Sequence, residues 1–158
     1  MHYLLPFFKW SDSSWIGVTI RSSRVYFPVI ETLHLLALTL LLGAIFMLNL
    51  RLCGLVMKNL PIQQVSRDLS PWLSGSLIAI LVSGFMLFAS EAMKCYASGP
   101  FQVKMLFLFG AIAYHFTIYR KVTKADREPK RIWAVTAGLI SVVLWLGVGL
   151  GGRGIAFL

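Results

Sequence analysis

The sequence is poor in charge and especially poor in acidic residues. Only 13% of its 158 residues are charged, and 6 Asp and Glu face 15 Lys and Arg. It has 2 cysteines and 3 histidines, and it lacks a Gly-rich phosphate loop, a cysteine cluster and a paired nucleophile and base. Those patterns carry most nucleotide binding and covalent catalysis. Catalysis by this chain alone is therefore not expected.

The cysteines are also unsuited to a disulfide. Cys53 and Cys95 follow opposite ends of two successive apolar runs, so they are expected on opposite membrane faces, too far apart to pair. The start of the chain lacks the basic segment of a signal peptide, and its first apolar stretch is broken by Pro6. A removable leader is therefore not expected.

Four long apolar runs dominate what is present. They lie between Arg24 and Arg51, Asp68 and Glu91, Lys104 and Arg120, and Arg131 and Arg153. A helix needs about 20 apolar residues to cross a bilayer. With 58% hydrophobic residues and a mean hydropathy of +0.76, the sequence predicts an all-α integral membrane protein, a four-transmembrane-helix bundle. The net charge of +9 sits at helix ends and in loops, which indicates headgroup contact rather than nucleic-acid binding.

The order of segments follows from these runs. Residues 1–24 mix Phe, Trp and Ile with Ser and Arg, which predicts an amphipathic interfacial segment, partly helical from Ser13 or Ser14. Residues 25–158 form one transmembrane domain, with Pro28 in the first turns of its first helix. The predicted helices cover about 25–50, 69–93, 101–119 and 131–152.

Basic residues set the orientation. The first and third loops hold Arg51, Lys58, Arg67, Arg120, Lys121, Lys124, Arg127, Lys130 and Arg131. The other side holds Lys9, Arg21, Arg24, Lys94, Lys104 and Arg153. Positive residues favour the cytoplasmic side, so both termini are predicted to be periplasmic. In the last run, Gly147 and Gly151 permit close backbone approach, either inside the bundle or against another subunit.

Ionisable residues at membrane depth are the functional candidates. Glu31 and His34 share a face of the first helix, and Asn49 returns to the same stripe five turns later. On the third helix, Lys104 and His115 lie about 20° apart around the axis. Both faces are predicted to point into the bundle or toward a partner.

Glu31, Glu91 and Lys94 are expected to form a polar cluster in the outer half of the bundle, with Glu91 and Lys94 near the outer end of the second helix. Glu91 is predicted to form an ion pair with Lys104. The Glu31 and His34 pair also occurs in di-iron bundles, but those need a second such motif, which this chain lacks.

The two membrane histidines are candidate haem ligands. From their distances to the helix ends, His34 and His115 differ in depth by about 8–10 Å, which weakens one haem held between both. A single axial histidine fits as well, and a purely structural role for each imidazole stays open. Lys104, Arg21 and Arg24 could neutralise haem propionates near the outer surface.

Several short motifs resemble those of an uncharacterised family of small bacterial four-helix inner-membrane proteins. These are Thr19-Ile20-Arg21-Ser22-Ser23, Tyr26-Phe27-Pro28, Glu31 with His34-Leu35-Leu36, Gly43, Asn49-Leu50-Arg51-Leu52, Gly54-Leu55, Pro71-Trp72, Ser83-Gly84 before Phe88, Phe101 with Lys104, and Leu144-Trp145 before Gly152-Arg153. The resemblance begins near Trp15 and implies the fold and a bacterial inner-membrane location, but no activity. The family usually has Asp where this chain has Asn49, and Asn where it has His115. A looser likeness to copper-resistance membrane domains and small b-type cytochromes is one of fold only.

The resulting expectation is a small membrane subunit of an electron-transfer assembly, holding b-type haem through His34, His115 or both. Its partners would be the lipid bilayer and membrane or periplasmic proteins, or further copies of itself. A cofactor-free structural or anchoring subunit is the main alternative. Copper handling through His34, Met47 or Met93 is a third, although the methionines show no ligand spacing.

Overall fold

Four long helices form the body of the protein in the computed structural model, which describes residues 5–123 and 130–155. They are α3 (Tyr26–Leu52), α4 (Ile62–Ser90), α6 (Gly99–Tyr114) with its continuations η2 (His115–Tyr119) and α7 (Arg120–Thr123), and α8 (Arg131–Ile155). Each is long and apolar enough to cross a membrane. The described residues contain no strand. The predicted all-α membrane bundle is therefore confirmed.

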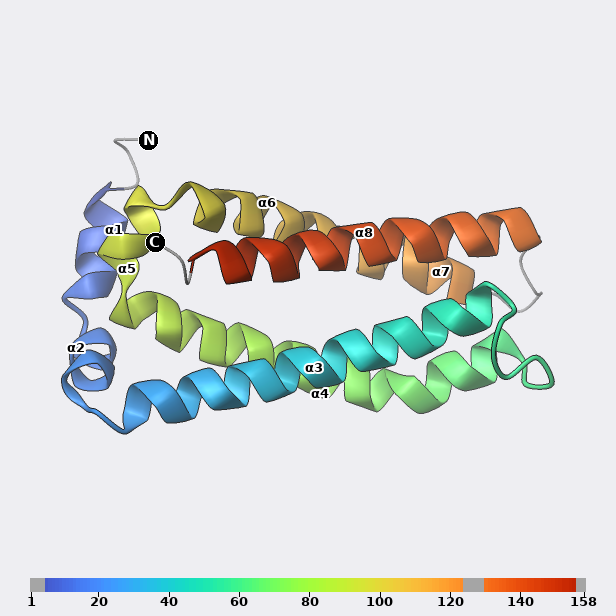
Figure 1. The fold of residues 1–158 in the computed structure, drawn as a ribbon, viewed down its shortest axis with the longest axis horizontal. Coiled ribbons are helices and arrows are strands. Elements are labelled where there is room, and N and C mark those ends of the chain that lie inside the picture. Colours follow the sequence, from blue (N-terminus) through green and yellow to red (C-terminus); the bar gives the residue numbers. More distant parts are fainter. Residues whose placement is uncertain (1–4, 124–129, 156–158) are drawn as a thin grey trace.

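The long helices are arranged as two antiparallel hairpins (Figure 1). Helix α3 packs along α4 in one hairpin, and α6 packs along α8 in the other. The hairpins meet mainly through α3 and α8. Only Ala111 is buried within α6, so this helix lies at the edge of the bundle.

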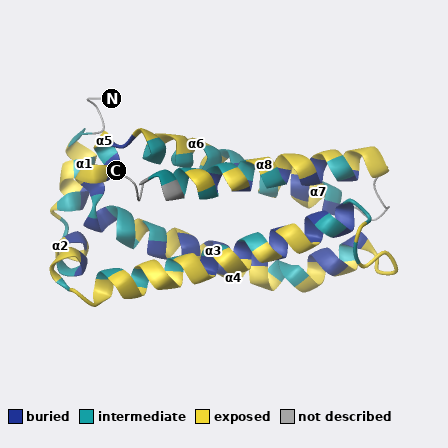
Figure 2. Ribbon diagram, in the orientation of Figure 1, coloured by how far each residue is buried: buried dark blue, intermediate teal, exposed yellow. Residues whose placement is uncertain are grey.

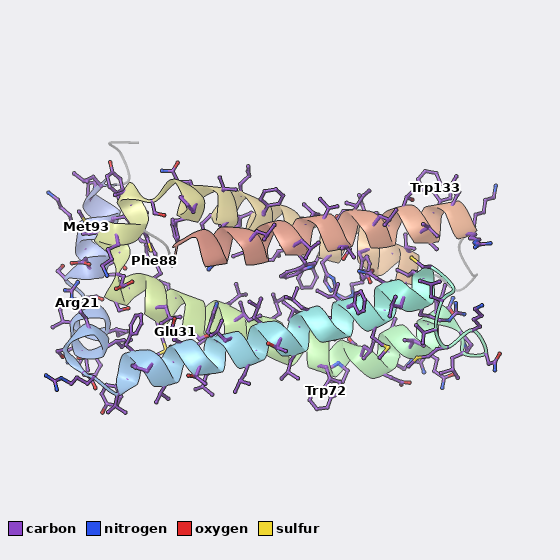
Figure 3. All side chains as sticks on the ribbon, in the orientation of Figure 1. Arg21, Glu31, Trp72, Phe88, Met93 and Trp133 are labelled. Atoms are coloured by element: carbon purple, nitrogen blue, oxygen red, sulfur yellow. The ribbon has the colours of Figure 1, made fainter. Side chains whose placement is uncertain are left out.

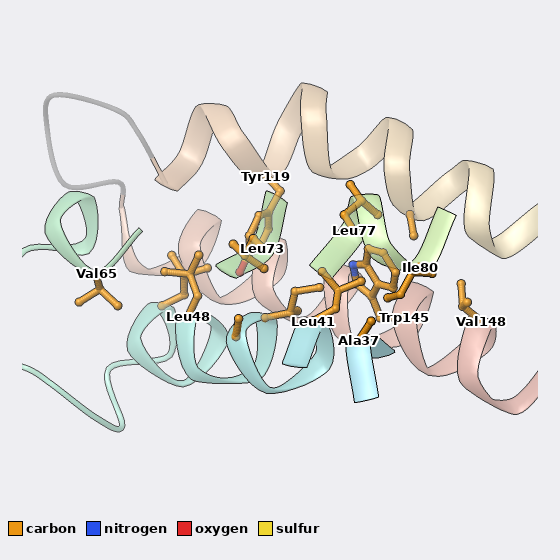
Figure 4. Packing of buried hydrophobic residues seen from close by; sticks show 14 of the residues in the cluster. Ala37, Leu41, Leu48, Val65, Leu73, Leu77, Ile80, Tyr119, Trp145 and Val148 are labelled. Carbon is orange, nitrogen blue, oxygen red and sulfur yellow. The ribbon is translucent and has the colours of Figure 1, made fainter. Parts of the chain in front are cut away.

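The core follows the length of the bundle (Figure 4). Its largest apolar members include Leu41 and Leu48 from α3, Leu77 from α4, Tyr119 from η2 and Trp145 from α8. The outer faces are also apolar, as the exposed residues in Figure 2 and the projecting side chains in Figure 3 show. Trp72, Trp133, Leu106 and Leu150 are each more than half exposed. A bundle that is apolar inside and outside is suited to a lipid environment.

Three short helices gather at one end, which we call the cap end. They are α1 (Leu5–Asp12), α2 (Trp15–Ser22) and α5 (Ala92–Ala97). Ser14 caps α2 by accepting a hydrogen bond from the Gly17 N–H at 3.2 Å, which confirms a helix start at Ser13 or Ser14. Gly17 lies directly against the backbone carbonyl of Ala89, so α2 packs closely on α4. Helices α1 and α5 were not predicted.

Aromatic rings tie the cap end together. Phe8 of α1 packs edge-on against Phe88 of α4 and Tyr96 of α5, each with ring centroids 5.3 Å apart. Phe88 in turn stacks on Phe101 of α6 at 5.7 Å. The start of α1 and the end of α8 lie at this same end (Figure 1). The loop between α3 and α4 lies at the opposite end of the bundle, which we call the loop end.

Two helix boundaries differ from prediction. Helix α4 begins at Ile62 rather than near residue 69, because its first two turns are polar and extend beyond the apolar run. It ends at Ser90, where Glu91 leaves the helical conformation and a separate helix, α5, follows. The other predicted helices agree within a few residues, and Pro28 lies in the first turn of α3 as predicted.

The glycine pair of α8 packs inside the chain. A Cβ on Gly147 would collide with the ring of Phe107, and one on Gly151 would lie 3.0 Å from the Cα of Lys104. Both neighbours belong to α6. The alternative of close packing inside the bundle is therefore the one that the structure contains.

The two cysteines are free, and Cys95 is buried. They lie at opposite ends of the bundle, as predicted, because Cys53 follows α3 and Cys95 belongs to α5. Burial raises the pKa of the Cys95 thiol to about 11, with a further contribution from the negative charge of Glu91.

We expect Cys95 to resist alkylation in the folded protein. With a pKa of about 11, about one thiol in a thousand is ionised at pH 8. Maleimide labelling in detergent should be slow at pH 8 and accelerate about tenfold per pH unit up to pH 10. Mass spectrometry of digested protein measures this residue alone, and denatured protein is the control. Fast labelling of folded protein at pH 8 would contradict the burial.

Candidate functional site

His34 lies half-buried between α3 and α4 in the cap half of the bundle. Its Nδ1 is 2.8 Å from the Oγ of Ser83 on α4. The neighbouring Gly84 makes room for the ring, because a Cβ there would lie 3.2 Å from the His34 Cε1. Ser83 and Gly84 of α4 thus hold the imidazole of His34, which belongs to α3.

The hydroxyl of Ser83 determines the tautomer of His34. Ser83 Oγ donates its proton to the backbone carbonyl of Ala79 at 2.5 Å, a bond within its own helix. The hydroxyl oxygen is then left as the acceptor for His34, which favours the tautomer with the proton on Nδ1. That tautomer, when neutral, keeps a lone pair on Nε2, the arrangement of a metal-ligating histidine whose other nitrogen is held by a hydrogen bond.

Lys104 is the cation of the same half of the bundle. It is half-buried on α6, with its Nζ 3.7 Å from the position of a Cβ on Gly152 of α8. It is the sixth residue of α6, which starts at the cap end, so it lies in the same half of the bundle as His34. The structure therefore brings His34, Ser83 and Lys104 into one region, which we call the cap-half site.

Several predicted members of this region lie elsewhere. Glu31 is exposed on α3, whereas His34 is half-buried and Asn49 is buried, so the structure does not place Glu31 inside the bundle with them. Residues three apart on a helix differ by 60° around its axis, so Glu31 and His34 share a face only approximately. Glu91 is ion-paired with Lys94 at 2.5 Å rather than with Lys104, so the predicted pairing with Lys104 is wrong. Glu91 lies between α4 and α5, and its side chain pairs with Lys94 of the short helix α5.

The two candidate propionate arginines differ from each other. Arg21 is ion-paired with Asp12 at 2.9 Å and reaches the Ser90 carbonyl at 3.4 Å, which links α2 to α1 and α4. Arg24 is exposed. Arg21 therefore serves the cap end, where its charge is already neutralised.

His115 lies in a different environment, at the start of the π-helical turn η2. Its ring stacks on Tyr119 with centroids 5.5 Å apart and packs edge-on against Phe116 at 5.4 Å. The buried hydroxyl of Tyr119 donates to Asn49 Oδ1 at 2.7 Å. Asn49 is thus a buried member of this cluster, and its Nδ2 has no hydrogen-bond partner among the described residues. Tyr119 was not predicted, because a Tyr near a helix end normally indicates an interfacial anchor.

The histidines lie at different levels along α4. His34 contacts Ser83 and Gly84, whereas His115 shares a cavity with Leu73 and Leu77. Six residues or more along a helix correspond to about 9 Å or more of rise. The two imidazoles are therefore separate sites, in agreement with the depth mismatch that the sequence indicated.

Met47 and Met93, the methionines considered with His34 for copper, lie on different helices. Met47 is thirteen residues after His34 on α3, about 20 Å along its axis. Met93 lies at the cap end on α5 (Figure 3). Within residues 5–123 and 130–155, no three His, Cys, Asp or Glu side chains form a group that could hold a metal ion. A multi-ligand copper or di-iron centre has no support from this geometry.

The chain belongs to the family of unknown function DUF6644, which matches residues 7–158. This confirms the resemblance to an uncharacterised family and extends it over nearly the whole chain. Searches of curated proteins and of solved structures give no match.

Proposed function

We propose that the protein is a small membrane subunit of an electron-transfer assembly that holds one b-type haem through His34. The observation that supports this is the hydrogen-bonding of His34, whose Nδ1 is engaged by Ser83 while Nε2 keeps a lone pair. Haem held by His34 would supply one-electron transfer.

The residues around His34 have defined tasks in this proposal. Ser83 fixes the tautomer and the ring orientation, and Gly84 leaves room for the imidazole beside α4. Lys104 places a positive charge in the same half, where it favours a propionate. Arg24, exposed at the cap end, is the second candidate for that role.

His115 is less suited to haem. Its ring is stacked on Tyr119, and the cavity that it lines measures about 70 Å³. We therefore propose a structural role for His115, whose ring is stacked on Tyr119, and the ligand role for His34, whose Nδ1 is held by Ser83.

The location is also a proposal. The excess of basic residues in the first and third loops favours the cytoplasm for the loop end. The cap end, with His34 in its half of the bundle, would then face the periplasm of a bacterial inner membrane. A periplasmic or membrane donor would meet the protein there, and a quinone in the bilayer is a suitable second redox partner.

A cofactor-free anchoring subunit is the second candidate. Helix α6 buries only Ala111, and its outer face exposes Leu106 and Phe109 by 75% and 64%. Such a face can pack against a helix of a larger membrane complex as well as against lipid. This candidate predicts a colourless protein that copurifies with partners.

Replacement of each histidine separates the candidates. We expect His34→Ala to lose bound haem and His115→Ala to retain it, because Ser83 orients the His34 ring, whereas the His115 ring is stacked on Tyr119. Haem content per chain is measured from the absorbance of purified protein and a pyridine extract. Equal haem in both variants and in the wild type would refute the assignment of His34.

A further inference from the structure

A second polar site lies in the loop half, on the far side of the bundle from the proposed haem ligand. It is a cavity of about 70 Å³ between α4 and the η2–α7 continuation of α6. Its polar lining comes from Ser66, Ser70, Ser74, His115 and Arg120, and Phe116 forms part of its apolar wall. A buried water needs only about 10–15 Å³, so this space admits a larger polar group.

The serines form a ladder of donors. Ser66, Ser70 and Ser74 recur every four residues, so they follow one face of α4. Serines elsewhere on α4 donate hydrogen bonds to carbonyls of their own helix, as Ser76 does to the carbonyl of Trp72 at 2.5 Å. The three ladder serines instead line the cavity, and a serine hydroxyl can donate one hydrogen bond.

Arg120 supplies the charge. Its guanidinium lies 6.0 Å from the centroid of the Phe116 ring, which restrains it beside the cavity. Arg120 follows directly on the five-residue π-helical turn that begins at His115. Such turns shift the facing of the residues that follow, and they recur at functional sites. Within the cavity lining, Arg120 is the only permanently charged side chain and no carboxylate is present.

One end of the cavity, at Ser66 and Arg120, lies near the depth of a lipid headgroup. Helix α4 has 29 residues, or about 43 Å at the usual rise, whereas the hydrocarbon core is about 30 Å thick. Its terminal turns therefore reach the headgroup layer. Ser66 lies in the second turn of α4, and Arg120 lies three residues before the end of the third span at Thr123.

We infer that this cavity binds a phosphate group, with Arg120 and the hydroxyls of Ser66 and Ser70 as its donors. The phosphate belongs either to an anionic lipid of the leaflet at the loop end or to a free anion. Arginine and hydroxyl donors around an oxyanion form charge-assisted hydrogen bonds, which are the strong ones. This site is independent of the haem proposal.

Native mass spectrometry of the full chain in detergent tests the inference. Phosphatidylglycerol is titrated against the protein, with diacylglycerol as the phosphate-free lipid and inorganic phosphate as the free anion. We expect phosphatidylglycerol to bind and diacylglycerol not to compete. Competition by inorganic phosphate at similar concentrations identifies a free anion as the ligand, and its absence identifies the lipid.

Two variants and one control locate the site. Arg120→Gln and Ser70→Ala should each weaken binding, Arg120→Gln by about tenfold or more, the loss of a hydrogen bond to a charged group. Arg67→Gln removes an exposed arginine at the same end of α4 that does not line the cavity, and it should bind as the wild type does. Arg120 is itself exposed, so the variant is expected to fold. Equal weakening by Arg67→Gln, or unchanged binding in both site variants, would overturn the inference.

Discussion

Gly151→Val is expected to destabilise the bundle strongly, whereas Gly149→Val is not. A Cβ on Gly151 would lie 3.0 Å from the Cα and 3.2 Å from the N of Lys104, which are both backbone atoms of α6. Backbone cannot rotate aside as a long side chain can, so α6 must move away from α8. Overpacking of this kind typically costs about 1–3 kcal/mol, and α6 has little other packing to compensate.

Gly149 is the matched control because nothing lies within 4 Å of a Cβ at that position. Both substitutions add the same side chain to the same helix two residues apart. Thermal unfolding in detergent, followed by circular dichroism at 222 nm, compares them with the wild type. Equal midpoints for the two variants would mean that α6 does not pack on Gly151.

Gly84→Leu is expected to abolish haem retention if His34 is the ligand. The Cβ alone would lie 3.2 Å from His34 Cε1, and the rest of a leucine side chain would occupy the space of the ring. The imidazole must then leave Ser83, and its Nε2 loses the orientation that the hydrogen bond imposes. Changes to residues that orient a metal ligand typically cost 10-fold to 100-fold in metal affinity, and displacement of the ligand itself costs more.

Gly75→Leu serves as the control on the same helix. A Cβ there meets nothing within 4 Å, so the substitution adds equal bulk without contacting His34. The ratio of haem absorbance to protein absorbance in purified samples measures retention. Full retention in Gly84→Leu would show that the ring of His34 does not hold the haem.

The spans of the fold were predictable because lipid imposes a simple requirement. Each helix must present about 20 apolar residues, and that requirement leaves a run that is visible in the sequence. The polar first turns of α4 and the short helices α1 and α5 lie outside the hydrocarbon, where no such requirement applies. Their positions depend instead on tertiary contacts, such as Phe8 on Phe88 and Gly17 on the carbonyl of Ala89.

The candidate site was predictable only in part. His34 and Lys104 stand out because ionisable residues are rare at membrane depth, and the structure brings them into the same half of the bundle. Ser83 and Gly84 are small residues without a distinctive pattern, so their contact with His34 depends on the rotation of α4 about its axis. Glu31 shares a helix face with His34 only approximately, because residues three apart differ by 60° around the axis, and it is exposed.

The most direct test of the account is a reduced-minus-oxidised absorbance spectrum of the gently solubilised, purified chain, with iron measured on the same sample. The account predicts a b-type difference spectrum with about one haem per chain. A colourless, iron-free protein that is otherwise folded would contradict it. His34 would then be a structural imidazole held by Ser83, and the anchoring alternative would take its place.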